Sequence, residues 1–191
     1  MSKNILIIDG HPDADRGRYV HALADAYAAG ASDSGHKIER LELATIDIPF
    51  LRSRAEWTDG TPPPDIAAAQ EAIRRAEHLV ILYPLWLGDV PALLKAFLEQ
   101  VARPGFALAE GTIPRPLLTG RSARLVVTMG MPAFFYRFYY AAHSVKSFER
   151  NILKLVGIDP VEHTLIGNVE GEAETRREWL DRLFNLGTAG A

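Results

Sequence analysis

Two uninterrupted apolar runs, residues 5–8 and 79–82, most constrain the fold of this 191-residue chain. Short runs of this kind, rich in β-branched residues, are typical of strands buried on both faces of a parallel sheet. Between them, Tyr19, Leu23 and Tyr27 recur at helical spacing. Strands that alternate with helices predict a parallel sheet connected by right-handed crossovers.

The rest of the chain continues the same alternation. The other predicted elements are strands at 37–43, 123–128 and 161–166, helices containing 66–73, 94–101, 134–155 and 180–184, and irregular segments at 44–64 and 102–120. Asp65 is expected to cap the second helix. We therefore predict an α/β flavodoxin-like three-layer fold. Its five-stranded parallel sheet has the order 2-1-3-4-5, with helices on both faces and a single domain over residues 1–191.

The composition excludes several classes of protein. The net charge is -3, so the chain lacks the basic surface of a nucleic-acid-binding protein. It contains no cysteine, which rules out disulfides and thiolate chemistry. The N-terminal residues do not resemble a signal peptide, and no apolar stretch is long enough to span a bilayer. We expect a cytoplasmic protein with no membrane insertion and no nucleic-acid partner.

The segment 83–95 follows the second apolar run directly and places Pro84, Leu85, Trp86 and Leu87 at the end of a buried strand. Open α/β sheets bind ligands outside the carboxyl ends of their strands. The Trp86 ring offers a flat apolar wall there, and a helix begins at Pro91. This junction is the predicted binding site for a flat ligand.

The loop 9–18 joins the first strand to the first helix, the usual position of a phosphate site in such sheets. It has neither a dinucleotide fingerprint nor a Walker A sequence. Cations at a helix N-terminus are unfavourable unless an anion is bound, which favours Arg16 and Arg18 as phosphate ligands. The alternative is two solvated arginines. A cation site on the aspartates of this loop is less favoured, and no metal site is predicted.

The segment 128–143 is the second candidate site. The fourth strand ends in Thr128, Met129 and Gly130, where a backbone can approach a ligand closely. Six aromatic residues follow within positions 134–140. One helix cannot bury all of them, so some are expected to contact a ligand or a partner subunit.

Taken together, these segments resemble the NAD(P)H:quinone oxidoreductases with a flavodoxin-like fold, including the ancillary proteins of potassium-efflux systems. The resemblance covers nearly the whole chain. It rests on His11-Pro12, Tyr83-Pro84-Leu85 with Trp86, Pro91, Leu94-Lys95, residues 97–101 and 105–107, Thr128-Met129-Gly130, Tyr136 and His143.

The resemblance implies a role for each candidate residue. His11 and the turn through Arg16, Gly17 and Arg18 would hold the phosphate of a flavin, either FAD or FMN. Residues 84–87 would line the isoalloxazine ring. Thr128, Met129 and Gly130 would contact its pyrimidine end. Tyr136 and His143 would be catalytic residues at the place where nicotinamide and quinone alternate.

The implied activity is a ping-pong reaction in which NAD(P)H reduces the flavin and a quinone or another small flat acceptor then takes two electrons. The resemblance also implies a homodimer. One alternative is a flavin-binding regulatory subunit that associates peripherally with a membrane transporter. Another is a phosphate-binding module without flavin, because fold alone does not determine function.

Overall fold

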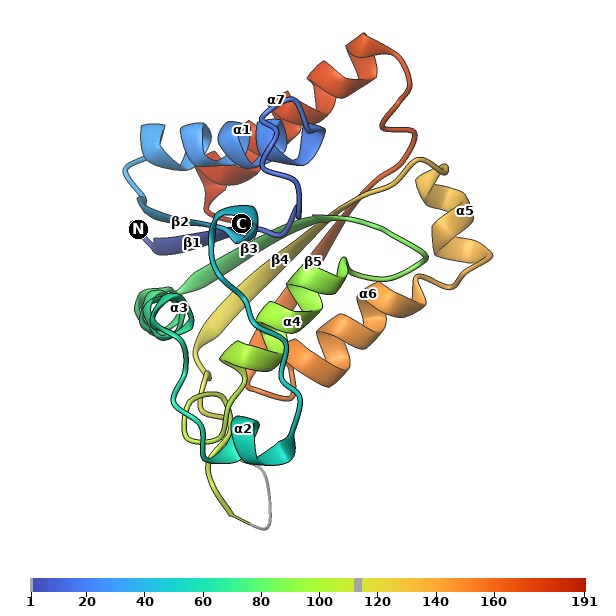
Figure 1. Cartoon of the computed structure of the whole chain (residues 1–191). Helices are drawn as coiled ribbons and strands as arrows, with labels where there is room; N and C mark the ends of the chain where they lie inside the picture. The colour runs from blue at the N-terminus through green and yellow to red at the C-terminus, as the bar shows by residue number, and fades with distance from the viewer. Residues whose placement is uncertain (1, 112–114) are drawn as a thin grey trace.

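A five-stranded parallel sheet in the order β2-β1-β3-β4-β5 lies at the centre of the computed structural model, which describes residues 2–111 and 115–191 (Figure 1). The strands are β1 (Asn4–Asp9), β2 (Lys37–Glu42), β3 (His78–Pro84), β4 (Arg121–Thr128) and β5 (Ile158–Ile166). The predicted strands and their order are confirmed. All seven residues of β3 are buried, as expected for a strand at the centre of a three-layer fold.

Helices cover both faces of the sheet (Figure 1). Helices α1 (Tyr19–Asp33) and α7 (Ala173–Ala189) pack on one face, against Val80 and Leu82 of β3. Helices α3 (Pro64–Arg75), α4 (Ala92–Val101) and α6 (His143–Phe148) cover the other, where Leu79 and Ile81 point. Alternate residues of the strand therefore enter different cores. No helix in the described part of the chain is long and apolar enough to cross a bilayer.

Two glycines allow α1 and α7 to pack with their backbones nearly touching. A Cβ built on Gly30 would lie 1.9 Å from the carbonyl oxygen of Phe184. A Cβ on Gly187 would lie 2.1 Å from the carbonyl oxygen of Tyr27. Each helix thus presents a glycine to the backbone of the other, and any side chain there would push the helices apart.

The predicted irregular segment 44–64 contains more structure than expected. It includes part of η1 (Leu43–Thr45) and the short helix α2 (Arg54–Thr58), whose first turn is capped by Ser53 Oγ accepting from Glu56 N at 3.1 Å. The predicted cap at Asp65 is wrong, because α3 already begins at Pro64. The Asp65 carboxylate instead accepts a hydrogen bond from the N–H of Asp47 at 3.1 Å.

The single helix predicted over 134–155 is also wrong. The chain forms α5 (Ala133–Phe138), α6 and the π-helical turn η2 (Glu149–Leu153). Ala141 and Ala142, with φ of 53° and 48°, break the segment between α5 and α6. The described residues therefore form seven α-helices and not five. Residues 112–114 of the predicted irregular segment 102–120 lie outside the described part.

Candidate active site

Three loops meet at the carboxyl edge of the sheet because the strands that precede them are neighbours. The N–H of Gly10, after β1, donates to the carbonyl oxygen of Leu82 in β3 at 2.8 Å. The N–H of Leu85, after β3, donates to the carbonyl oxygen of Thr128 at the end of β4 at 2.7 Å. The sheet order reverses between β1 and β3, which is where open α/β sheets bind their ligands. The structure therefore brings the three predicted segments together.

The loop after β3 makes a tight turn that exposes two large apolar side chains. Trp86 and Asp89 exchange two backbone hydrogen bonds, each of 2.9 Å, around Leu87 and Gly88. Both central residues have positive φ, 50° and 81°, as a two-residue hairpin turn of this kind requires. Leu87 is fully exposed and Trp86 about half exposed, whereas Pro84 is buried at the end of β3. Exposed apolar groups in a loop at this edge indicate a surface that a ligand or a partner covers.

Backbone N–H groups beside these side chains are free to bind a ligand. Those of Leu87, Gly88 and Gly130 have no hydrogen-bond acceptor among the residues that the structure describes. Thr128 and Met129 are buried, so at the surface this segment contributes the backbone of Gly130, where even a Cβ would meet nothing within 4 Å. An apolar wall with unpaired donors suits a flat heteroaromatic ring that carries carbonyl and ring-nitrogen acceptors. The isoalloxazine of a flavin is such a ring, and these residues fit it.

A hollow of about 480 Å³ lies between this turn and α6. The turn contributes Trp86, Leu87 and Val90, and α6 contributes Ser144 and Phe148. Its size is within the range of small-molecule sites. His143 lies next to the turn, because its Cε1 atom is 3.8 Å from the position that a Cβ of Gly88 would occupy.

The two predicted catalytic residues occupy different environments. His143 is exposed, and its Nδ1 lies 3.1 Å from the carbonyl oxygen of Tyr140, which can only accept. The proton of a neutral His143 ring therefore sits on Nδ1, and Nε2 is left for a ligand. Tyr136 is 1% exposed, and its hydroxyl lies 2.7 Å from Ser144 Oγ. Tyr136 thus faces the interior and contacts the residue next to His143.

The aromatic rings of the segment 134–140, which lie on α5 and on the two residues after it, form three groups. Tyr136 enters the core. Phe135 and Tyr139 stack at a centroid distance of 4.8 Å, and Tyr140 packs edge-on against both rings. Phe134 and Phe138 line a hollow of about 700 Å³ beside β5. All these rings except Tyr136 are at least 40% exposed, so the expectation that one helix cannot bury them is confirmed.

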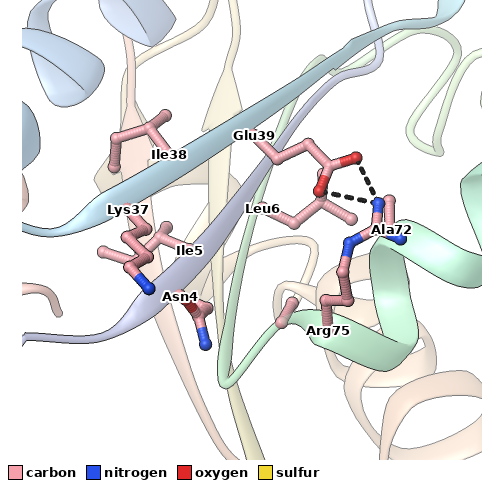
Figure 2. A pocket seen from close by; sticks show the side chains of 9 residues that line it. Asn4, Ile5, Leu6, Lys37, Ile38, Glu39, Ala72 and Arg75 are labelled. Atoms are coloured by element: carbon pink, nitrogen blue, oxygen red, sulfur yellow. Dashed lines mark hydrogen bonds and ion pairs between the residues drawn. The ribbon is translucent and has the colours of Figure 1, made fainter.

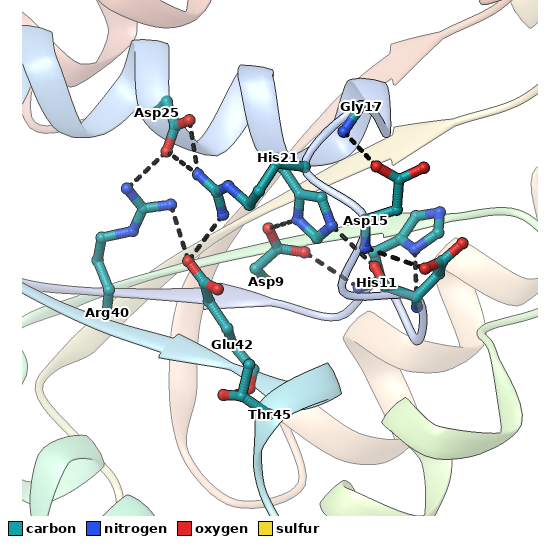
Figure 3. A network of polar contacts seen from close by, with 11 residues as sticks. Asp9, His11, Asp15, Gly17, His21, Asp25, Arg40, Glu42 and Thr45 are labelled. Carbon is teal, nitrogen blue, oxygen red and sulfur yellow. Dashed lines mark hydrogen bonds and ion pairs between the residues drawn. The ribbon is translucent and has the colours of Figure 1, made fainter.

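In the loop after β1, side-chain acceptors hold every second backbone N–H group (Figure 3). The acceptor atoms are Asp9 Oδ1, His11 Nδ1, Asp13 Oδ1 and Asp15 Oδ1, and each accepts from the N–H two residues further along at 2.9–3.1 Å. The N–H groups of Ala14 and Arg16, which alternate with these, have no acceptor among the described residues. The loop therefore keeps donors for an anion such as a phosphate.

The two arginines of this loop are engaged with carboxylates. Arg16 contacts Asp25 at 2.8 Å and Glu42 at 3.0 Å, and Figure 3 shows that Arg40 joins the same network. Arg18 contacts Asp13 at 2.7 Å. The N–H of Asp15 and then the Arg18 guanidinium lower the pKa of the Asp13 carboxyl, so this carboxylate is charged at neutral pH. For either arginine, binding a phosphate means exchanging one anionic partner for another.

His11 connects the first loop to the turn after β3. Its ring packs edge-on against Trp86 at a centroid distance of 5.9 Å. Burial and the neighbouring His21 ring lower the pKa of His11. Because Nδ1 accepts from the N–H of Asp13, the neutral ring carries its proton on Nε2. His11 is therefore a hydrogen-bond donor held between two of the site's loops.

A buried pair that the sequence did not predict lies under this loop. His21 is 1% exposed, and its Nδ1 lies 2.5 Å from Asp9 Oδ2. Asp9 follows the first apolar run directly, and His21 lies on the buried face of the first helix. A charged residue at the end of a buried strand, opposite a helical histidine, was the only signal for this pair.

A third hollow, of about 390 Å³, lies at the opposite end of the sheet (Figure 2). Asn4 and Lys37, which begin β1 and β2, line it together with Arg75 of α3. The Arg75 guanidinium is already paired with Glu39, at 2.8 and 3.0 Å. Ligands of parallel sheets bind at the carboxyl edge, so we assign no site here.

Comparison with known proteins identifies the family. Residues 3–187 match the family model described as a flavodoxin-like fold. The chain belongs to this flavodoxin-like family. Within it, the chain is 27% identical to an uncharacterised NAD(P)H oxidoreductase of Haemophilus influenzae, over 87% of this chain and 84% of that protein. It is 30% identical to an FMN-dependent NADH:quinone oxidoreductase of Ruegeria pomeroyi, over 58% of this chain and 63% of the other.

Solved structures of other flavodoxin-like proteins superpose on the whole chain. The NAD(P)H:quinone oxidoreductase of Methanothermobacter marburgensis has a TM-score of 0.84, with 25% identity, and covers all of both chains. The superposition includes the carboxyl edge where the three loops meet.

Proposed function

We propose that this flavodoxin-like protein is a flavin-dependent NAD(P)H oxidoreductase that reduces quinones or similar flat acceptors by two electrons. The observation that carries the proposal is the turn at the carboxyl edge. There, two exposed apolar side chains, Trp86 and Leu87, stand beside the unpaired N–H groups of Leu87 and Gly88. The adjoining segment after β4 adds the unpaired N–H of Gly130. The names of the Haemophilus, Ruegeria and Methanothermobacter proteins support the same activity.

In this proposal, the segments 84–87 and 128–130 hold the ring of the flavin, FMN or FAD. When bound, the flavin would accept a hydride from NAD(P)H and supply two electrons to the acceptor. The three N–H groups would stabilise the negative charge that reduction places on such a ring, and they need no reorganisation to do so. Leu87 and Trp86 would exclude water from one side of it.

The first loop would bind the phosphate of the flavin through the N–H groups of Ala14 and Arg16 and through Nε2–H of His11. Gly17 lies before the first helix, where a Cβ would come within 3.2 Å of Asp15 Oδ1. Arg16 and Arg18 would add charge after exchanging carboxylate partners. Guanidinium groups bind phosphate well because they offer paired donors.

His143 would hold or release a proton at Nε2, next to the acceptor. Its Nε2 has no hydrogen-bond partner among the described residues, which suits this role. Tyr136 would position His143 and not touch the substrate, since its hydroxyl contacts Ser144 at the start of α6. Tyr136 is thus proposed as a positioning residue.

We also infer a homodimer. Phe134, Phe138 and Tyr139 are 67%, 79% and 72% exposed, and they lie on the element that follows the ring site. A second copy that covered these rings would remove them from water and shield the acceptor site at the same time.

An absorption spectrum of the purified protein tests the proposal first, with FMN and FAD added separately if the protein is colourless. We expect the visible bands of an oxidised flavin, bleached by NADH or NADPH without oxygen and restored by a quinone. A protein that takes up neither flavin would refute the proposal. Flavin that binds and is reduced with negligible quinone turnover, in a protein that co-purifies with a membrane transporter, would support the regulatory alternative instead.

A further inference from the structure

The His21 ring lies between two hydrogen-bond acceptors. Nδ1 is 2.5 Å from Asp9 Oδ2, and Nε2 is 2.9 Å from the carbonyl oxygen of Asp13. Figure 3 shows the ring between β1 and the first loop. The side chains of His21 and Asp9 are 2% and 1% exposed, so no water competes for either contact.

This geometry fixes the number of protons on the pair. A neutral imidazole donates from one nitrogen only, and a carbonyl oxygen never donates. The contact with the Asp13 carbonyl therefore requires a proton on Nε2. The contact between Nδ1 and Asp9 Oδ2 requires a second proton, which lies on one of these two atoms. Carboxyl groups ordinarily lose their proton at lower pH than imidazolium groups, so this proton belongs to His21.

The charged groups around His21 agree with this assignment. Asp9 faces it from β1, and the His11 ring lies 5.4 Å away in the loop. Burial by itself lowers the pKa of His21, and the positive charge of Arg16 acts in the same sense. The hydrogen bonds to Asp9 and to the Asp13 carbonyl outweigh both effects, and the pKa is raised overall.

Through these contacts His21 connects the central sheet to the first loop of the site. Asp9 is the last residue of β1, whereas Asp13 is in the middle of the loop. The same two residues anchor His11, since Asp9 accepts from its N–H and the Asp13 N–H donates to its ring. The positions of the free N–H groups of Ala14 and Arg16 follow from where Asp13 is held.

We propose that His21 is a positioning residue of the phosphate site: its doubly protonated ring ties the Asp13 carbonyl to Asp9 and holds the first loop in the shape that receives an anionic phosphate. This proposal rests on the proposed function, because the phosphate is that of a flavin. It concerns only the phosphate end of the ligand, and the ring end is bound by other loops.

The protonation state is measured on the flavin-free protein with ¹⁵N-labelled histidine by NMR. At neutral pH we expect both ring nitrogens of His21 to be protonated. In Asp9→Asn, an amide can donate to Nδ1, so we expect a neutral ring that still donates from Nε2 to Asp13. A neutral His21 in the unmodified protein would overturn the assignment. This readout needs no flavin and no activity.

The positioning role is tested by the ratio of the affinities for FMN and riboflavin, which differ only by the phosphate. Asp9→Asn should keep this ratio, because both hydrogen bonds of His21 survive. Asp9→Asn/His21→Phe removes the bridge without leaving a lone buried charge, and we expect FMN binding about tenfold weaker with riboflavin binding unchanged. His163→Phe is the matched control, since it removes a histidine–carboxylate contact of 3.0 Å between β5 and Glu149 of η2.

Each outcome decides a different claim. An unchanged ratio in the double variant, or equal weakening of FMN and riboflavin, would overturn the positioning role while leaving the proposed function intact. An unmodified protein that binds neither riboflavin nor FMN would instead refute the proposed function.

Discussion

Individual histidines in this protein are held in different protonation states by their surroundings. His11 and His21 are neighbours with ring centroids 5.4 Å apart, yet the pKa of the first is lowered and that of the second is raised. His78, at the start of β3, is more extreme, because burial lowers its pKa to about 4. Its Nδ1 contacts Ser122 Oγ at 2.8 Å, while Nε2 is buried without a partner among the described residues.

His78 makes folding stability depend on pH. The unfolded chain takes up a proton at an ordinary pKa of 6.5, whereas the folded protein does so only near 4. The contribution of His78 is therefore fully present above pH 6.5 and is lost as the pH falls toward 4. We expect the unfolding free energy to drop by about 2 kcal/mol more between pH 7 and pH 5 in the natural protein than in His78→Phe. Urea titrations at both values measure this difference, and equal drops would contradict it.

Substitutions of His143 and Tyr136 are predicted to affect different properties: the first lowers quinone turnover, and the second lowers the unfolding free energy. His143→Ala should reduce quinone turnover by about 10²-fold while flavin affinity and stability stay unchanged. Tyr136→Phe and Ser144→Ala each remove one buried hydrogen bond, so each should cost about 1 kcal/mol of unfolding free energy. Their double variant should cost little more than either one, because both changes remove the same contact. Quinone turnover that is unaffected by His143→Ala would remove this residue from the proposed mechanism.

At the residue scale, the sequence predicted which residues lie near the carboxyl edge of the sheet. It did not predict which partners each of them contacts. Arg16 was predicted to be a phosphate ligand from its position near a helix start, and it lies in the loop just before α1. Its partners Asp25 and Glu42 belong to a helix and a neighbouring strand, so their contacts arise only when the sheet forms. Tyr136 is buried for the same reason, since burial depends on how α5 packs.

At the scale of elements, β1 and β3 were predictable because a strand buried on both faces is a continuous apolar run. The helices were predictable where one apolar face persists over several turns, as in α1 and α4. The break between α5 and α6 had no such signal, because the two residues with positive φ are alanines and not glycines. The short helix α2 has no buried residue, so its sequence carries no periodic face.

The contact between α1 and α7 depends on its two glycines. Gly30→Ala and Gly187→Ala should each lower the unfolding free energy by about 2–3 kcal/mol, because the backbones must separate. This cost exceeds the gain of about 1 kcal/mol in helix propensity. Thermal or urea unfolding measures it, with Ala29→Ser on the exposed face of α1 as the control. A stabilised Gly30→Ala protein would show that the helices are not so close.

At the scale of the whole molecule, the exposed aromatic rings predict self-association. Sedimentation should give twice the mass of the chain, and Phe138→Ser/Tyr139→Ser should shift the protein toward the monomer. Phe50→Ser is the matched control, because Phe50 is 60% exposed but lies on the loop before α2. A monomeric natural protein at micromolar concentration would contradict the inferred dimer.

The donors at the carboxyl edge belong to the backbone, and this has an evolutionary consequence. A mutation at position 87 changes the wall of the pocket but leaves its N–H group in place, provided that the turn is kept. In the proposed function, selection would therefore vary the acceptor that the pocket admits without rebuilding the backbone donors that are proposed to hold the ring. A fold of this kind can therefore evolve new substrate preferences through substitutions at a few exposed positions. Its backbone meanwhile stays superposable with that of a relative that shares a quarter of its residues.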